Sequence, residues 1–248
     1  SVVQNTAPRL APELALDARG VARRFGARWV LRGVNLQVRA GEIVGLLGHN
    51  GCGKSTLLRI VATLLKSSAG DAYVYGANVR TEGDDVRRHV GFFAHVPGLY
   101  DDLTARENLA FAATMLGLPS ADIDAAIERV GLAHVTHERV RGFSAGMQRR
   151  LSLARLILQR PRLLLLDEPY NNLDIAGMAL VNDFIRDLSA AGGAALIVVH
   201  DLAPAAGVLE RTVTIRDGRV AVPTAADLTH DGASPEAVTL PAGAAGIS

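Results

Sequence analysis

The stretch that decides the fold runs from Ile43 to Leu64 and reads IVGLLGHNGCGKSTLLRIVATL. It begins with an apolar run without alternation, which is typical of a strand covered on both faces in a parallel sheet. It ends with Leu57, Ile60, Val61 and Leu64 at helical spacing, which predicts a helix with one buried face. The sequence therefore predicts a strand, a glycine-rich turn and a helix in direct succession.

The turn between these two elements fits the pattern G-x-x-x-x-G-K-[ST], from Gly48 to Ser55. Glycines let backbone N–H groups point inward at a phosphate chain, and the N-terminus of the following helix adds partial positive charge. We expect ATP to bind here, with Lys54 reaching the β and γ phosphates and Ser55 binding Mg²⁺. The residues expected to contact the nucleotide are Gly48, His49, Asn50, Gly51, Cys52, Gly53, Lys54, Ser55 and Thr56.

Composition limits the other classes of function. The chain has 248 residues, 49% hydrophobic and 21% charged, enough for one large domain or a domain with an inserted lobe. The net charge is +1, and arginine pairs such as Arg149-Arg150 are typical of solvated helix faces, so no nucleic-acid partner is indicated. The single cysteine excludes an intrachain disulfide. No apolar run approaches the roughly 18 residues of a membrane span, so we expect a cytoplasmic chain.

The pattern along the chain predicts four regions: a loose arm at residues 1–13, a domain at 14–222, a helical lobe inserted at about 97–161, and a short tail at 223–248. At the start of the domain, alternating polarity predicts an antiparallel edge sheet beside the phosphate-loop strand. Phe25, at a break in that pattern, is placed to stack on a base, although simple packing would explain it too. In the lobe, Thr104 with Glu107 three residues on is a capping box, which predicts the start of a helix that Gly117 ends. Near the end of the domain, Asp217-Gly218 predicts the turn of a hairpin.

Two further buried strands end in polar residues, one at Asp167-Glu168 and one at His200. Ligands of open α/β sheets bind at such strand ends. Asp167 can hold Mg²⁺ through water, and Glu168 can orient or deprotonate the attacking water. His200 could hydrogen-bond the γ phosphate, although a strand-end histidine alone is more often structural. We therefore predict that Glu168, His200 and Lys54 are catalytic.

Ser144 is a candidate N-cap whose helix offers a second anion-attracting end. It lies on the lobe, with no evident route to the phosphates held by its own loop. A head-to-tail homodimer would let Ser144 and the Gly146 backbone of one chain close over the γ phosphate of the other. Dimerisation would then depend on ATP binding.

Together these motifs, over Leu14 to Val222, resemble the nucleotide-binding domain of ABC transporters. The resemblance implies an α/β fold with a P-loop NTPase (RecA-like) core, an antiparallel β edge sheet and an inserted α-helical subdomain. It implies ATP hydrolysis coupled to transport, ATP and Mg²⁺ as cofactors, and an integral membrane permease subunit that holds the chain at the cytoplasmic face of the inner or plasma membrane. It assigns roles to Phe25 as the aromatic loop, Asp174 as the D-loop, His200 as the switch histidine, and Ser144, Ala145, Gly146, Met147 and Gln148 as the signature acting in trans.

The chain departs from the family pattern at His49, Cys52, Ala145 and His95, where proline, alanine, glycine and glutamine are usual. At His95, imidazole can replace the hydrogen bonding of glutamine but not its acceptor oxygen on Mg²⁺. Two interpretations of His95 are open. It is either a coupling-loop residue and candidate metal ligand, or a residue that only packs within its loop. Cys52 precedes a helix N-terminus beside Lys54, which predicts a lowered thiol pKa and alkylation that blocks ATP binding.

His95, the stretch Leu103 to Leu109 and the Ser-Ala-Gly signature resemble the ATPase subunit of cytochrome c maturation haem exporters. The rival within this class is the ATPase subunit of a drug, antibiotic or polysaccharide exporter. A second class is a soluble ABC ATPase acting on ribosomes or DNA, which typically carries two cassettes or a long coiled coil. A third is a module that binds nucleotide without hydrolysis, which Glu168 disfavours.

Overall fold

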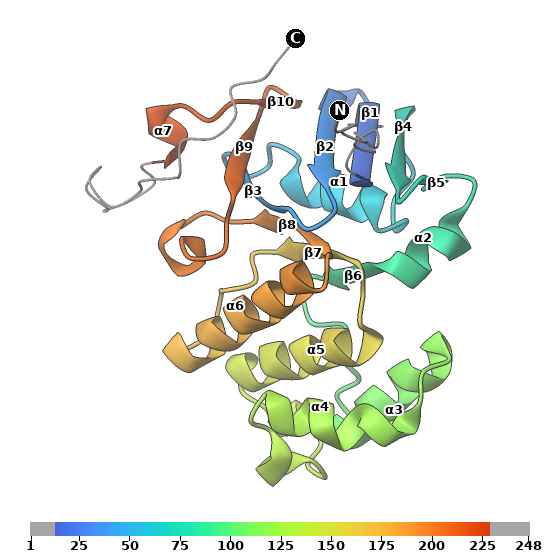
Figure 1. Ribbon diagram of the computed structural model, residues 1–248, viewed down its shortest axis with the longest axis vertical. Coiled ribbons are helices and arrows are strands. Elements are labelled where there is room, and N and C mark those ends of the chain that lie inside the picture. Colours follow the sequence, from blue (N-terminus) through green and yellow to red (C-terminus); the bar gives the residue numbers. More distant parts are fainter. Residues whose placement is uncertain (1–12, 229–248) are drawn as a thin grey trace, which may run out of the picture.

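The computed structural model describes residues 13–228, which form two sheets and a helical layer that extends into a lobe (Figure 1). Nearly all of the arm predicted at 1–13, and the tail predicted beyond 228, lie outside the described residues. The α/β fold with a helical insertion is as predicted.

The central sheet has six strands in the order β10-β9-β3-β8-β7-β6, and all but β10 are parallel. The strands are β3 (Ile43–Leu47), β6 (Val90–Phe93), β7 (Leu163–Asp167), β8 (Ala194–Val198), β9 (Arg211–Arg216) and β10 (Arg219–Ala221). Asp217 and Gly218, at φ 51° and 73°, form the predicted turn between β9 and β10. The carboxyl ends of β3, β7 and β8 therefore meet at one edge, where the predicted site residues follow.

The second sheet is antiparallel, in the order β2-β1-β4-β5. Its strands are β1 (Leu14–Phe25), β2 (Arg28–Arg39), β4 (Ala69–Val74) and β5 (Ala77–Asn78). The predicted antiparallel sheet is confirmed, but it is separate from the sheet of β3, because the neighbours of β3 are β8 and β9. A backbone hydrogen bond of 2.7 Å from Arg32 to Gly218 joins β2 to the β9–β10 turn.

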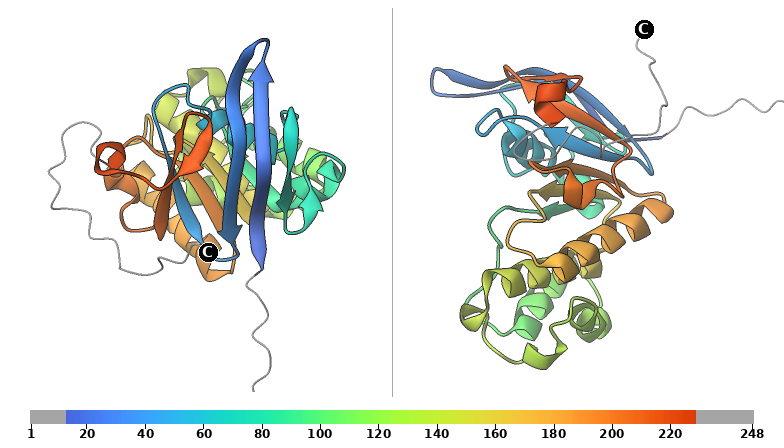
Figure 2. Two further views of the ribbon diagram at one scale, coloured as in Figure 1. Left: turned by 90° about the horizontal axis from the view of Figure 1, so that it is seen from above. Right: turned by 90° about the vertical axis from the view of Figure 1, so that its left-hand side faces the viewer.

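Alternation along the buried strands divides the core into two layers. Val44 and Leu46 of β3 share a cluster with β1, β2 and helix α1 (Lys54–Val61), which lies between the two sheets. The prediction that Leu64 lies on the buried face of this helix is wrong, because the helix ends at Val61 and Leu64, after Thr63 at φ 61°, is 63% exposed. Ile43 and Leu47 face the opposite layer, which contains α5 (Ala145–Gln159) and α6 (Ile175–Ala190). Helix α2 (Gly83–His89) precedes β6. Figure 2 shows α6 beneath the sheets and the lobe beyond it.

The lobe is built from α3 (Ala105–Leu116), α4 (Ile123–Arg129) and α5, with short 3₁₀ turns η1 (Ser120–Asp122), η2 (Ala133–Val135) and η3 (Val140–Gly142) between them. The predicted capping box starts α3: the Glu107 N–H donates to Thr104 Oγ1 at 3.1 Å, and the Thr104 N–H donates to Glu107 Oε2 at 2.8 Å. Gly117, at φ 66°, ends the helix. Local sequence thus fixes both ends of α3.

The first six residues of the predicted tail are attached to the core, after the 3₁₀ turn η4 (Ala203–Ala205) and strands β9 and β10. Helix α7 (Ala225–Leu228) forms one turn. Asp227 accepts a hydrogen bond from the Thr224 N–H at 2.7 Å and pairs with Arg216 at 2.6 Å. No helix among residues 13–228 has the length and apolar character needed to cross a membrane.

Candidate functional site

The glycine-rich turn follows β3 and needs its glycines. Gly48, Gly51 and Gly53 have φ values of 136°, 76° and 114°, a region that favours glycine. A Cβ on Gly48 would lie 2.7 Å from Cys52 Sγ and 2.8 Å from the Ile215 carbonyl oxygen. A Cβ on Gly53 would lie 2.6 Å from the Leu31 side chain. The loop is therefore a close-packed backbone structure at the start of α1.

Lys54 is buried within this loop. Its Nζ donates to the carbonyl oxygens of Gly48 at 2.5 Å and His49 at 3.1 Å. The ammonium group is thus directed back across the turn, the position expected for a lysine that contacts phosphates held by the loop.

Ser55 and Asp167 meet although they are far apart in sequence. Ser55 Oγ donates to Asp167 Oδ1 at 3.0 Å, and Asp167 is buried at the end of β7. Burial and the neighbouring Glu168 charge raise the pKa of Asp167, against the hydrogen bond from Ser55. Hydroxyl and carboxylate oxygens are ligands that Mg²⁺ prefers, so the pair fits the predicted metal site.

Glu168 is held by three side chains. Its Oε1 lies 2.5 Å from His200 Nε2, its Oε2 lies 3.3 Å from His95 Nδ1, and Asn171 Nδ2 donates to Oε2 at 2.6 Å. Burial alone would raise the pKa of Glu168, but the His200 hydrogen bond and the two imidazoles lower it below its usual value. The carboxylate is therefore ionised and fixed in direction, as a group that receives a proton from water must be.

Arg149 was missed by the sequence argument, and the prediction that the Arg149-Arg150 pair lies on a solvated face is wrong. Arg149 is 2% exposed, because its guanidinium reaches inward from α5 to the carbonyl oxygens of Ala94, His95 and Glu168. Arg150 pairs with Asp174 at 2.7 Å. Helical periodicity could not reveal these contacts, since the acceptors lie on loops far along the chain.

The residues from Ser144 to Gln148 begin α5. Ser144 Oγ accepts from the Met147 N–H at 3.2 Å, which confirms the predicted N-cap, and Ala145 opens the first turn. A Cβ on Gly146 would lie 3.1 Å from the Asn172 carbonyl oxygen, so this turn lies against the segment that carries Asp174. Asp174 in turn caps α6 by accepting from the Gly177 N–H at 2.8 Å.

Residues 31–171 match the family model described as ABC transporter. The chain belongs to this family. It is therefore an ABC-type ATP-binding subunit, an ATPase coupled to transport, and domains of this type bind ATP, generally with Mg²⁺. Subunits of this family generally dimerise and pair with membrane permeases.

Three relatives illustrate the range of the family. The chain is 38% identical to the uncharacterized ABC transporter ATP-binding protein YdbJ of Bacillus subtilis, over 84% of this chain and 68% of that protein. It is 38% identical to the bacitracin transport ATP-binding protein BcrA of Bacillus licheniformis, over 68% of this chain and only 56% of BcrA. It is 37% identical to the cytochrome c biogenesis ATP-binding export protein CcmA 2 of Cupriavidus metallidurans, over 79% of this chain and 93% of that protein.

Solved structures agree with this assignment. An ATP binding subunit of an ABC transporter superposes with a TM-score of 0.78 at 28% identity, over 83% of this chain and 88% of that one. The cbiO1 protein of Clostridium perfringens, described as part of the ABC transporter complex cbiONQ, superposes with a TM-score of 0.71 at 25% identity, over 85% and 88% of the two chains.

In this ABC subunit, the predicted base-stacking residue lies at the end of β1. Phe25 is 47% exposed, and the Arg23 guanidinium carbon lies 4.6 Å from its ring centroid. Trp29, nearby on β2, is also exposed. The simple packing alternative for Phe25 is therefore disfavoured, because its ring is outside both hydrophobic clusters.

The prediction of a lowered thiol pKa at Cys52 is wrong. Cys52 is 6% exposed and belongs to the hydrophobic cluster shared by β1, β2 and α1. Burial raises the pKa of its thiol, and the opposing charge of Lys54 does not offset this. The backbone of Cys52 stays in the loop, but its sulfur points into the core.

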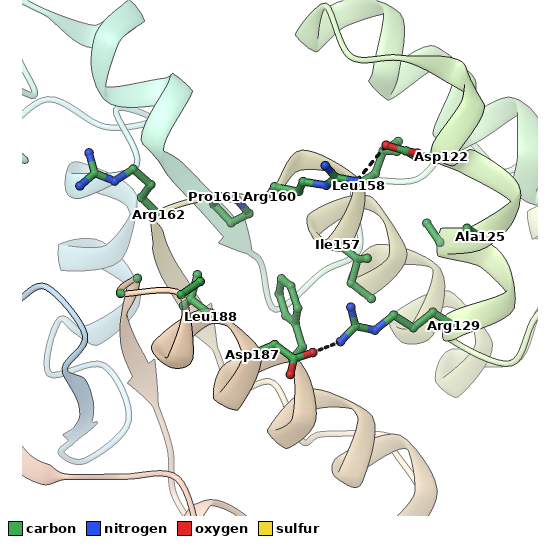
Figure 3. Close-up of a pocket in the computed structure, with 15 residues that line it drawn as sticks. Asp122, Ala125, Arg129, Ile157, Leu158, Arg160, Pro161, Arg162, Asp187 and Leu188 are labelled. Atoms are coloured by element: carbon green, nitrogen blue, oxygen red, sulfur yellow. Dashed lines mark hydrogen bonds and ion pairs between the residues drawn. The ribbon is translucent and has the colours of Figure 1, made fainter.

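A large cavity lies away from these residues, at the junction of lobe and core (Figure 3), and a second, smaller one lies beside them. The large cavity measures about 530 Å³ and is lined by α4, the second half of α5 and the end of α6. Arg129 of α4 and Asp187 of α6 form an ion pair across it. The smaller cavity, about 110 Å³, touches Gly48, His49, His200 and Asp227. Only the smaller one borders the predicted nucleotide site.

Proposed function

We propose that two copies of this chain bind MgATP head to tail and hydrolyse it to drive a separate integral membrane permease. The observation that carries the proposal is the meeting of Ser55, Asp167, Glu168 and His200 at one sheet edge, beside the glycine-rich turn and Lys54. These residues come from the carboxyl ends of three adjacent parallel strands, where α/β sheets bind ligands.

In this proposal the backbone from Gly48 to Thr56 and the Lys54 ammonium hold the phosphates, while Phe25 stacks on the base. Ser55 and Asp167, the latter through water, hold Mg²⁺, which would neutralise charge on the β and γ oxygens. Glu168 accepts a proton from the attacking water, and its orientation depends on His200 and His95. His95 would also bind the metal through Nε2, the ring nitrogen that does not face Glu168.

The homodimer is supported by the surface around the signature. Ile175 is 88% exposed although it is a large apolar residue, and it directly follows Asp174 at the start of α6. The first turn of α5, from Ala145 to Gln148, lies close to it through the contact of Gly146 with Asn172. We propose that Ser144 to Gln148 of one chain meet the γ phosphate of the other, with both Asp174 segments at the shared boundary.

A docking surface for the permease is supported by exposed apolar side chains just after His95. Val96 and Tyr100 on the loop, and Phe111 and Met115 on α3, are all exposed. The rings of Tyr100 and Phe111 are in edge contact, with centroids 4.9 Å apart. Such a patch is typical of an interaction site. The permease would hold the chain at the cytoplasmic face of the membrane, next to a loop that reaches Glu168.

We propose haem export for cytochrome c biogenesis as the transport type. His95 and the Ser-Ala-Gly signature support this choice, and so does the near full-length match to the CcmA 2 relative. Export of an antibiotic or drug is the second candidate, supported by 38% identity to the bacitracin transport protein.

The assignment of Glu168 is tested by phosphate release from the wild type, Glu168→Gln and the surface control Glu128→Gln. Glu168→Gln should lose about 100-fold or more in kcat, while Glu128→Gln should match the wild type. Light scattering with saturating MgATP should find Glu168→Gln dimeric. A monomeric Glu168→Gln, or one that hydrolyses normally, would contradict the proposal.

The transport type is tested by purifying the chain with its membrane subunit from native membranes and reconstituting the complex. Haem should stimulate its ATPase activity, and bacitracin should not. Stimulation by bacitracin alone would favour the second candidate.

A further inference from the structure

One arginine of the signature helix reaches the backbone of two loops, the one that carries His95 and the one that carries Glu168. Arg149 Nη1 donates to the carbonyl oxygens of Ala94 at 2.8 Å and His95 at 3.1 Å, and Nη2 donates to that of Glu168 at 2.5 Å. Its guanidinium carbon lies 4.2 Å from the Phe93 ring centroid. A single rigid side chain therefore joins α5 to the ends of β6 and β7.

Placing this charge inside the protein is unfavourable. Burial lowers the pKa of Arg149 to about 10, although the Asp167 and Glu168 carboxylates oppose the shift. Its hydrogen-bond acceptors are neutral carbonyl groups, and its Nε has no partner among the described residues. Buried charges usually have a charged, fully hydrogen-bonded partner. An apolar residue would fill this space at lower cost, so stability alone does not explain Arg149.

The backbone of Glu168 needs support, since its φ of 51° lies in the left-handed region. A non-glycine residue is strained there and keeps that conformation only where its surroundings fix it. The Glu168 N–H donates to the Val198 carbonyl oxygen at 3.2 Å, and Arg149 binds the Glu168 carbonyl oxygen. Arg149 thus fixes the peptide that follows the strained residue.

Helix α5 contacts the core along its whole length. Its second half borders the cavity of about 530 Å³ around Ile157 and Leu158, and it is joined to β6 by the hydrogen bond of 2.8 Å that Gln159 Nε2 donates to the Val90 carbonyl oxygen. Its first half carries Arg149 and its three hydrogen bonds. Movement of the signature end of α5 would therefore be passed to the two loops through Arg149.

We propose that Arg149 is a positioning residue: through it, the signature helix sets the backbone of His95 and Glu168 and so the direction of the Glu168 carboxylate. The inference rests on the proposed role of Glu168. Arg149 touches neither nucleotide nor water in this scheme. Its loss should lower the rate of hydrolysis while nucleotide affinity stays the same.

The test compares Arg149→Met, Arg149→Lys and a control, Arg155→Met. Arg155 lies on the same helix and also donates to a loop carbonyl, that of Gly98 at 2.9 Å, but it makes no contact with Glu168. Affinity is measured from the fluorescence of Trp29, the only tryptophan, as a nucleotide analogue is added. Thermal unfolding reports folding, and phosphate release gives kcat and KM.

Arg149→Met should lose about 100-fold in kcat, since a small misplacement of a reacting group costs about that much, with KM and affinity little changed. Arg149→Lys should recover part of the rate, because an ammonium group can reach some of the three carbonyls. Arg155→Met should hydrolyse like the wild type. Adding Glu168→Gln to Arg149→Met should leave the ATP-dependent dimer intact.

The inference is overturned if Arg149→Met keeps its kcat, if Arg155→Met loses as much, or if affinity falls in parallel with rate. If Arg149→Met does not fold, Arg149→Lys decides in the same way. A Glu168→Gln variant that hydrolyses normally would instead defeat the proposed function. An inactive Glu168→Gln beside a fully active Arg149→Met would defeat this inference alone.

Discussion

His95 and His200 contact opposite oxygens of one carboxylate: His200 Nε2 lies 2.5 Å from Glu168 Oε1, and His95 Nδ1 lies 3.3 Å from Oε2. The His95 side chain is also about half exposed, on the loop that leads to the apolar patch of Val96, Tyr100, Phe111 and Met115. A partner that moved this loop would therefore act on Glu168 directly.

Replacing His95 should show whether it supports the Glu168 carboxylate or only packs within its loop. His95→Ala removes one contact from the Glu168 carboxylate and should lower kcat about tenfold, the equivalent of one charge-assisted hydrogen bond. His95→Gln, which restores an amide donor, should recover most of this loss. His137→Ala, at an exposed histidine of the lobe, is the matched control. If His95→Ala hydrolyses ATP as fast as His137→Ala, the His95 side chain only packs within its loop.

Glu42 should make stability depend on pH. Burial raises the pKa of Glu42, but hydrogen bonds from Arg211 Nε at 2.5 Å and the Arg39 N–H at 2.8 Å lower it overall. A lowered folded pKa stabilises the protein above the unfolded value near 4.5, and this contribution disappears as pH falls through the folded pKa.

Glu42→Gln should accordingly lower the free energy of unfolding at pH 7, and the difference from wild type should shrink as pH falls below about 4.5. Urea titrations at several pH values measure it. Glu210→Gln, at an exposed position near the same strand ends, is the control measured beside it. A gap for Glu42→Gln that stays constant down to the acid range would rule out this linkage.

Features that depend on neighbouring residues could be predicted from the sequence. Contacts between loops that are distant in the sequence could not. The capping box at Thr104, the Asp217-Gly218 turn and the strand ends at Asp167 and His200 depend on residues within a few positions, so the sequence contained them. Arg149 has acceptors 55, 54 and 19 positions away, which only the fold brings together. Cys52 was misjudged for the same reason: Lys54 is only two positions away in sequence, but burial against the second sheet raises the pKa of the thiol.

Cys52 should be a slow thiol in the folded protein. Because it is buried and is the only cysteine, a disulfide-exchange reagent should modify the native chain at least roughly tenfold more slowly than the urea-unfolded chain. Absorbance of the released thiolate gives both rates, and Cys52→Ala gives the background. Rapid native labelling that MgATP suppresses would restore the original interpretation of an accessible thiol beside the phosphates.

Gly146 should be required for the dimer rather than for folding. Within a helix, alanine is favoured over glycine by about 1 kcal/mol, so Gly146→Ala should stabilise an isolated first turn of α5. In this chain, the added Cβ would lie 3.1 Å from the Asn172 carbonyl oxygen and would press on the segment that carries Asp174.

We therefore expect Gly146→Ala, in a Glu168→Gln background, to bind ATP normally by Trp29 fluorescence but to stay monomeric by light scattering. Ala145→Gly, one position earlier, is the matched control and should still dimerise. A dimer of undiminished stability in Gly146→Ala would show that this turn does not lie at the shared boundary.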